Sequence, residues 1–179
     1  MTVSTESSEL ATDEAIAAAM RPLPDAEILS FLHLEARLAD EGRYSEWESL
    51  WANGDDSVVY RVPMHPDDDP RTTLAYINDN RRRIKSRVAQ LNTGVRHSQT
   101  PPSVMRRVLS NSEVIATGAD TVTVESNFGL FEYRYRQRFW AGRVVHTVRR
   151  SDSGGLRLVR KIVHLVDAGG PLDTLAFLI

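Results

Sequence analysis

The chain has 179 residues, 41% of them hydrophobic, which is typical of one domain with a substantial core. Its 22 basic and 24 acidic residues give a net charge of −2, and this excludes a global field that would attract nucleic acid or an anionic membrane. The chain has no cysteine, which excludes disulfides, thiolate metal sites, iron–sulfur ligation and cysteine nucleophiles.

The first part of the chain is rich in Ser, Thr, Glu and Ala. This composition predicts a flexible arm at residues 1–21, followed by a single domain at 22–179. The longest apolar run near the start, Ala15 to Met20, is too short to span a membrane, and acidic residues stand where a signal peptide carries basic ones. We therefore expect a cytoplasmic protein that makes no membrane contact.

Two helices are predicted after this arm. Apolar residues from Ile28 to Leu38 recur at helical spacing and stop at Glu41-Gly42, where a glycine typically ends a helix. The segment 45–48 has the Ser-x-x-Glu form of a capping box, which predicts a short helix at 45–52.

A strand is predicted at 57–62, ended by Pro63 and followed by a polar loop at 65–70. A third helix is expected beyond it, with Asn78 as a plausible cap. Its apolar face carries Ile77, Ile84, Val88 and Leu91, and its opposite face carries five basic residues that we expect to lie in water.

The stretch from 121 to 167 alternates apolar and polar residues, with interruptions only at 141–142 and 151–155. This pattern predicts three long antiparallel strands, and a turn at 118–120 joins them to a further strand at 104–116. Helices first and a meander afterwards predict an α+β fold in which the helices pack on one face of a strongly curved antiparallel sheet.

Within the first long strand the apolar positions change parity at Gly129. The even set is Val122, Val124, Phe128 and Leu130, and the odd set is Phe131, Tyr133, Tyr135 and Phe139. Because a one-residue slip turns every side chain to the other face, a bulge is predicted at Gly129.

Two histidines follow the apolar alternation of the later strands. His146 stands between Val144 and Val148, and His164 stands near Ile162, so both are expected to point toward apolar surroundings. Each could be a general base in a sheet-lined pocket, but an isolated histidine is more often a hydrogen-bonded core or interface residue. The five histidines lack paired ligand spacing and the aspartates at 67–69 lack calcium-loop spacing, so no metal site is predicted.

Arginines at 134, 136 and 138 interleave with Tyr133 and Tyr135. Such a strand can bind single-stranded nucleic acid by stacking, or it can meet acidic groups of a protein partner. The net charge of −2 favours the protein partner. The Walker A, dinucleotide-binding and nucleophile-elbow motifs are absent from the sequence.

Two features predict an oligomer. The last strand is apolar on both parities, although one helical layer covers only one face. The segment Leu172–Ile179 is too apolar to lie in water and is expected to dock at an interface.

Several short motifs occur in the order found in one known family. They are Glu35–Tyr44 followed by Trp47, Pro101-Pro102-Ser103, Val108–Asn111, Glu125–Phe128, Trp140–Arg143, Arg149-Arg150 and Leu172–Ile179. Over residues 28–179 the chain resembles the small (beta) subunit of aromatic-ring-hydroxylating dioxygenases. It departs from the family pattern at His97-Ser98-Gln99 and at Val145-His146.

This resemblance implies a cystatin-like, nuclear-transport-factor-like cone and a hexamer of three alpha and three beta chains. It implies that the alpha chain carries a Rieske 2Fe-2S cluster and a mononuclear iron. The beta chain is then a structural subunit of an oxidoreductase that dihydroxylates an aromatic compound in its catabolism, with no catalytic, cofactor-binding or metal-binding residue of its own. The missing cysteines agree, since a Rieske centre needs two cysteines and two histidines.

The alternative is a stand-alone enzyme with the same cone, such as an isomerase, dehydratase or hydrolase that performs acid/base chemistry inside the sheet. Its candidate residues are Asp40, Tyr60, His97 and His146. Fold alone does not decide between the two functions. A filled cone interior favours the subunit, whereas a deep pocket with convergent aspartate and histidine favours the enzyme.

Overall fold

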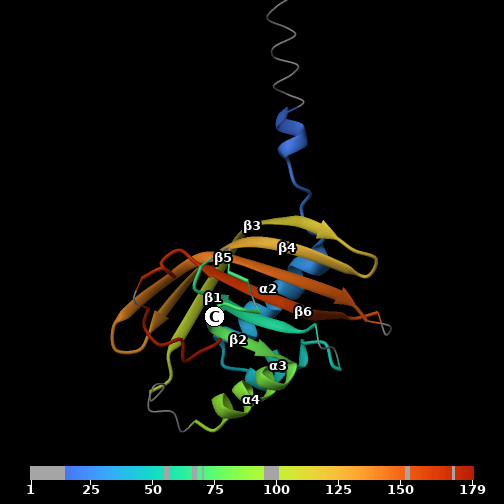
Figure 1. Ribbon diagram of the computed structural model, residues 1–179. Coiled ribbons are helices and arrows are strands. Elements are labelled where there is room, and N and C mark those ends of the chain that lie inside the picture. Colours follow the sequence, from blue (N-terminus) through green and yellow to red (C-terminus); the bar gives the residue numbers. More distant parts are fainter. Residues whose placement is uncertain are drawn as a thin grey trace, which may run out of the picture.

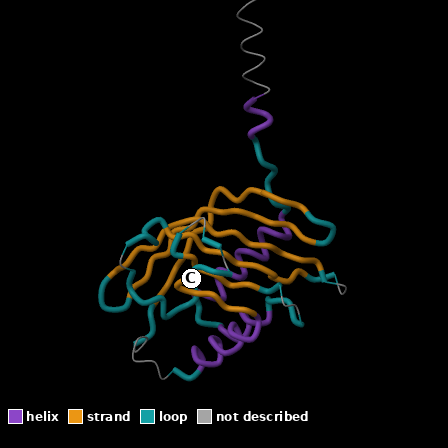
Figure 2. The backbone as a smooth tube through the Cα atoms, viewed as in Figure 1, coloured by secondary structure: helices purple, strands orange, loops and turns teal. Residues whose placement is uncertain are grey.

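The computed structural model describes residues 15–54, 57–65, 68–69, 71–94, 101–151, 154–170 and 172–179. Six strands form one strongly curved sheet in the order β2-β1-β6-β5-β4-β3 (Figure 1). The helices after residue 25 lie together on the hollow side of this sheet and at one end of it, whereas the short helix at 15–19 stands apart from the sheet (Figure 2). The predicted α+β architecture is confirmed.

Helix α2 (Ala26–Asp40) crosses the hollow face of the sheet. Its first turn is capped by Asp25, whose carboxylate accepts a hydrogen bond from the Ile28 N–H at 2.8 Å. The helix ends at Glu41, and Gly42 follows with a φ of +68°, which suits a residue without a Cβ. The predicted first helix and its glycine end are therefore confirmed.

Helix α3 (Tyr44–Ser49) starts one residue earlier than predicted, and the capping box is not formed. Arg43 occupies the N-cap position without a side-chain cap hydrogen bond. Ser45 lies inside the helix, where its hydroxyl accepts a hydrogen bond from the Asn92 amide, and Glu48 instead pairs with Arg81 at 2.6 Å. Both capping-box side chains are thus engaged by the neighbouring helix α4 (Arg81–Asn92).

Strand β1 (Val59–Pro63) confirms the predicted strand. Strand β2 (Ala75–Asn80) was not predicted: its Ile77 is buried and lies opposite Val62 of β1, not on a helix. Helix α4 (Arg81–Asn92) begins after β2, and its cap is Asn80 instead of Asn78. Ile77 stands seven residues before Ile84, so it fits the helical spacing although it belongs to the preceding strand.

The last four strands form the predicted antiparallel meander. They are β3 (Val104–Thr117), β4 (Thr121–Tyr133), β5 (Gln137–Arg150) and β6 (Leu156–Leu165). One part of the predicted pairing is wrong, because β1 joins β6 in a parallel pair and the sheet is therefore mixed.

The turn between β4 and β5 lies at 134–136, and the predicted interruption at Ala141-Gly142 falls inside β5. A Cβ atom added at Gly142 would stand 2.0 Å from the carbonyl oxygen of His164. The glycine is therefore required by the close approach of β6, not by a turn.

The bulge predicted at Gly129 is also absent, since the register runs unbroken through its pairs with Val108 and Ala141. Even-numbered residues of β4 face the core along the whole strand, and the aromatic odd-numbered ones face outward. The register shifts lie elsewhere: at 62–63 in β1, at 110–113 and 114–116 in β3, where Asn111 has a φ of 49°, and at 147–148 in β5. The strong curvature of the sheet was predicted correctly, but the position of the bulge was not.

The edge strand β3 is covered at two points by other parts of the chain. The Arg107 N–H donates a hydrogen bond to the Asp40 carboxylate at 2.7 Å, and the Val114 N–H donates one to the Pro22 carbonyl at 2.8 Å. Such contacts block the pairing of a further strand with this edge.

The last residue of the predicted arm lies against this edge, where Arg21 forms ion pairs with Glu113 of β3 and Glu125 of β4. The division into an arm at 1–21 and a domain at 22–179 stays a prediction, since residues 1–14 lie outside the described part of the chain. Across the described residues, none of the helices is both long and apolar enough to cross a membrane.

Candidate functional site

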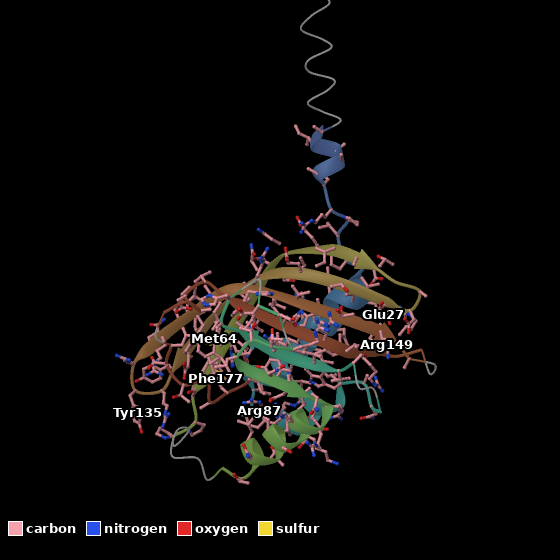
Figure 3. The ribbon with its side chains drawn as sticks, in the orientation of Figure 1. Glu27, Met64, Arg87, Tyr135, Arg149 and Phe177 are labelled. Carbon is pink, nitrogen blue, oxygen red and sulfur yellow. The ribbon has the colours of Figure 1, made fainter. Side chains whose placement is uncertain are left out.

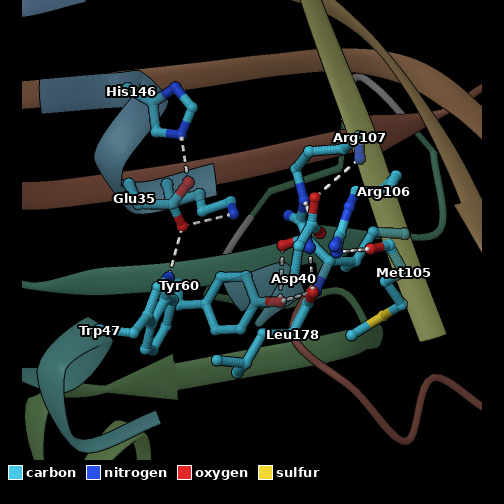
Figure 4. A network of polar contacts seen from close by, with 11 residues as sticks. Glu35, Asp40, Trp47, Tyr60, Met105, Arg106, Arg107, His146 and Leu178 are labelled. Atoms are coloured by element: carbon cyan, nitrogen blue, oxygen red, sulfur yellow. Dashed lines mark hydrogen bonds and ion pairs between the residues drawn. The ribbon is translucent and has the colours of Figure 1, made fainter. Parts of the chain in front are cut away.

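The hollow of the sheet contains a buried polar cluster built from three elements. Glu35, in the middle of α2, is 1% exposed and accepts hydrogen bonds from the Trp47 indole at 2.5 Å and from the Lys161 ammonium at 2.8 Å (Figure 4). Trp47 comes from α3 and Lys161 from β6. The cluster therefore joins two helices to the centre of the sheet.

Opposing electrostatic effects act on this pair. Burial alone raises the pKa of the Glu35 carboxyl, but the positive charges of Lys161 and Arg107 and the hydrogen bond from Lys161 act against burial, and the pKa is lowered to about 2. Burial lowers the pKa of the Lys161 ammonium, and the Glu35 charge opposes that shift. The geometry is that of a buried, hydrogen-bonded ion pair, which loses its compensation if either partner is removed.

His146 projects from β5 into the same interior and is 1% exposed, as its alternation predicted. Its Nε2 atom lies 3.8 Å from the Glu35 carboxylate, and neither ring nitrogen has a hydrogen-bond partner among the described residues. Burial lowers the pKa of this imidazole to about 4, although the Glu35 charge opposes the shift. His146 is therefore neutral at pH 7.

A second buried pair lies beside the first. The Arg107 guanidinium donates to the Asp40 carboxylate at 2.7 Å through Nε and to the Leu178 carbonyl at 2.7 Å through Nη2 (Figure 4). Both oxygens of Asp40 are engaged by Arg107, one by its side chain and one by its backbone N–H. Asp40 is thus occupied structurally and is not free to act as a base.

The segment at 176–179 fills the rest of the hollow, and the prediction that it docks at an interface is wrong. Phe177, Leu178 and Ile179 are each at most 1% exposed within the protomer itself. The Phe177 ring packs edge-on against Trp140 at 5.7 Å. The Ile179 N–H donates to the Tyr60 hydroxyl at 3.0 Å, and that hydroxyl donates to the Ile179 carbonyl. These apolar residues are therefore buried by the sheet and helices of their own protomer.

Beside this polar cluster lies a cavity of about 10 Å³, which is lined by residues that include Glu35, His146, Lys161 and Ile179. This is about the space that one water molecule needs. A drug-sized ligand needs roughly 300 Å³ or more. The interior is therefore filled, and no substrate fits between the candidate acid and base groups.

The structure brings only some of the predicted candidates together. His146 and Tyr60 both face the interior, and burial strongly raises the pKa of the Tyr60 phenol, which disfavours a phenolate there. His164 does not point inward: it lies opposite Arg143 and is half-buried. His97 lies outside the described residues. Among the residues that are described, no three metal-ligating side chains come together.

The comparisons with known proteins agree with this picture. The family model described as "Ring hydroxylating beta subunit" matches residues 34–168. The beta subunit of 3-phenylpropionate/cinnamic acid dioxygenase from Photorhabdus laumondii is 31% identical over 145 residues, which are 75% of this chain and 79% of that protein.

The chain belongs to the ring-hydroxylating beta subunit family.

Two solved structures place this beta subunit among known folds. The beta subunit of benzoate 1,2-dioxygenase from Burkholderia mallei has a TM-score of 0.70 at 22% identity, covering 89% of this chain and all of that one. An NTF2-like protein with a cystatin-like fold from Novosphingobium aromaticivorans has a TM-score of 0.54 at 20% identity, covering 79% of this chain and 80% of that one. The predicted cystatin-like cone is thus confirmed.

Sequence reasoning missed the central residues of the beta subunit's interior, which are Glu35, Lys161, Trp47 and Arg107. The sequence pattern did indicate that two of them, Glu35 and Lys161, lie in the core. Glu35 stands on the helix face of Leu32 and Ala39, and Lys161 stands between Val159 and Val163 in a strand, so each is a charge at a core position. Two opposite charges at core positions of different elements predict a buried pair.

Proposed function

We propose that this beta subunit performs no chemistry itself and holds an iron-containing alpha subunit in an active aromatic-ring-hydroxylating dioxygenase. The observation that carries the proposal is the filled cone. The cavity beside Glu35 and His146 measures about 10 Å³, and residues 176–179 are buried in the hollow of the sheet next to it. The same observation weakens the alternative of a stand-alone isomerase, dehydratase or hydrolase.

The finer parts of the proposal concern the assembly. The alpha partner carries the Rieske 2Fe-2S cluster and the mononuclear iron, and three alpha and three beta chains form the hexamer. The dioxygenase dihydroxylates an aromatic compound. The absence of cysteine from this chain supports the division of labour, because a Rieske cluster requires thiolate ligands. A cytoplasmic location stays a prediction.

The test is to purify the chain alone and together with a co-expressed ring-hydroxylating alpha subunit. We expect the two chains to co-purify as one species of defined mass, with iron and oxygenase activity in the complex. The chain alone should contain no stoichiometric iron by elemental analysis and should oxidise no aromatic substrate. Bound iron or turnover in the chain alone would contradict the proposal, as would failure to co-purify with the alpha subunit.

A further inference from the structure

One asparagine of the chain is set apart by the residue that follows it. Six asparagines are present, at 53, 78, 80, 92, 111 and 127, and only Asn53 precedes a glycine. In an Asn-Gly pair, the backbone nitrogen of the glycine can attack the side-chain amide carbon of the asparagine and close a five-membered ring. A side chain on the second residue hinders that approach, whereas glycine has no Cβ atom. Asn53 is therefore the asparagine most open to this reaction.

The structure leaves the Asn53-Gly54 pair accessible. Both residues are exposed and lie in a bend between α3 and β1, outside the helices and strands. Gly54 has a φ of +68°, and a Cβ atom built on it would meet nothing within 4 Å beyond its chain neighbours. Among the described residues, no acceptor binds the Gly54 N–H. The attacking nitrogen is thus not held in a strand ladder or a helix.

Arg81, the first residue of α4, holds the side chain that would be attacked. Its Nη2 atom donates a hydrogen bond to Oδ1 of Asn53 at 3.0 Å, and its Nε atom donates one to the Ala52 carbonyl at 3.0 Å. Its Nη1 atom pairs with Glu48 at 2.6 Å, so each nitrogen of the guanidinium is engaged. Oδ1 is the atom that gains negative charge when the amide carbon is attacked, and a fixed donor stabilises such a charge.

Water and further positive charge reach the same pair. An open groove of about 620 Å³ is lined by residues that include Asn53, Arg82 and Lys85. Within the described residues neither Arg82 nor Lys85 forms an ion pair, whereas Arg87, on the same helix (Figure 3), is engaged by Asp79 at 2.5 Å. A carboxylate formed at position 53 would therefore lie among cations, which favours the charged product.

We propose that Asn53 is a site of spontaneous deamidation, in which Arg81 assists the attack of the Gly54 nitrogen on the Asn53 side chain. The new bond joins that nitrogen to Cγ of Asn53, the bond from Cγ to Nδ2 breaks, and ammonia leaves with the proton of the Gly54 N–H. Water then adds to either carbonyl of the ring and opens it to an aspartate or an isoaspartate. Ammonia is exchanged for water, and no oxidant or reductant takes part.

The product changes the contacts at the start of α4. A carboxylate at position 53 competes with Glu48 for the Arg81 guanidinium, because a hydrogen bond between two charged groups is stronger than the present one to a neutral amide. An isoaspartate also lengthens the backbone that follows Ala52, whose N–H donates to the Leu158 carbonyl of β6 at 3.0 Å. This modification does not depend on the proposed function of the beta subunit.

A time course of the purified full-length chain tests the proposal. The chain is kept folded in buffer at mildly alkaline pH and digested at intervals, and mass spectrometry gives the fraction of each asparagine peptide in which the amide has become a carboxylate. Asn111 is the internal control, because it is exposed like Asn53 but precedes a serine. We expect Asn53 to convert at least about 10-fold faster than Asn111, which corresponds to about 1.4 kcal/mol in activation free energy.

Matched variants isolate the part played by Arg81. Arg81→Met removes the donor to Asn53, and Arg82→Met removes an equal charge from the next residue, which donates no hydrogen bond to Asn53 in the described chain. Arg81→Lys keeps the charge beside Glu48 but loses the forked donor. We expect Arg81→Met and Arg81→Lys to slow the conversion of Asn53 by about 10-fold, and Arg82→Met to slow it less. Thermal unfolding of each variant checks that the protomer is intact.

Two outcomes count against the proposal. Conversion of Asn53 no faster than that of Asn111 in the wild-type chain overturns the assignment of the site. If Asn53 converts as fast as in the wild type, or faster, in both folded variants of Arg81, the guanidinium only restrains the side chain and its assisting role is overturned. A slower conversion in both Arg81 variants than in Arg82→Met, with Asn111 unchanged throughout, supports the proposal.

Discussion

At the residue scale, the interior depends on charges that are fully compensated. Glu35 is held by Trp47 and Lys161, and Arg107 is held by Asp40 and the Leu178 carbonyl. A buried pair of this kind adds little net stability compared with well-packed apolar residues, but losing one partner costs about 3 to 5 kcal/mol. The cluster therefore specifies how α2, α3 and β6 fit together more than it stabilises them.

His146 predicts a pH dependence of stability. In the unfolded chain its imidazole protonates near its ordinary pKa of 6.5, whereas in the folded protein burial lowers the pKa to about 4. Between these values the unfolded state binds more protons, so the free energy of unfolding falls as the pH falls from 6.5 to 4. The expected loss is on the order of 3 kcal/mol, since each pKa unit corresponds to about 1.4 kcal/mol.

Urea unfolding at intervals from pH 7.5 to 4.5 measures this loss. The variant His146→Leu should flatten the profile in that window, and His33→Leu on the exposed side of α2 should not. Burial also lowers the pKa of His164, which leaves a smaller slope of the same sign. Below pH 4.5 both proteins should lose stability as Glu35, whose pKa is lowered to about 2, begins to protonate in the unfolded state. Equal slopes in wild type and His146→Leu would mean that His146 titrates normally and is not desolvated.

At the element scale, the strands were the most predictable part of the molecule. Strict alternation identified strands β4, β5 and β6, because a strand with one buried face must repeat every two residues. The same pattern could not separate an outward aromatic residue from an inward one. Phe131 and Phe139 therefore suggested a bulge at Gly129, although they lie on the outer face of the sheet. Strand β2 was missed because Ile77 fits a helical face equally well.

The segment 172–179 shows a different limit of sequence reasoning. Its apolar composition established that something must cover it, but composition does not say whether the cover is a partner or the chain's own sheet. The deciding contacts are long-range: Phe177 meets Trp140, and Ile179 meets Tyr60. Burial of Glu35 and Lys161 as a pair is a contact of the same kind, 126 residues apart in sequence. Local patterns mark the apolar and charged residues that need cover, but they do not show which distant residues meet them.

The packing of this segment predicts that it stabilises the protomer. Phe177→Ala should lower the free energy of unfolding of the isolated chain by about 3 to 5 kcal/mol, as for other buried phenylalanines. Leu74→Ala, at an 80% exposed position, should change it by no more than about 0.5 kcal/mol. Chemical denaturation of the chain without its partner measures both. An unchanged stability of Phe177→Ala would place the segment outside the cone in solution.

At the scale of the whole molecule, the same fold can either enclose a ligand-binding cavity or have an interior filled by its own side chains. The curved sheet with helices across its hollow side creates an interior in either case, and its contents decide the use. Here Trp47, Trp51, Tyr60 and Phe177 occupy it together with the two ion pairs. The outer face of the sheet, by contrast, carries exposed aromatic residues such as Phe131 and Phe139. The family resemblance could be read from the order of short motifs, whereas the filled interior could be learned only from packing.

A small apolar ligand tests whether the interior of the protein is filled or can bind a molecule. Benzene at saturation should not raise the melting temperature of the wild-type chain, because the cavity of about 10 Å³ has no room for it. Phe177→Ala removes a benzene-sized group next to Trp140, so the variant should bind the probe, and its melting temperature should rise with the logarithm of the benzene concentration once that exceeds Kd. Leu74→Ala, which opens no cavity, serves as the control for solvent effects of benzene. A clear rise for the wild type would mean that residues 176–179 leave the cone readily, and the interior beside Glu35 and His146 would then have to be treated as a binding site.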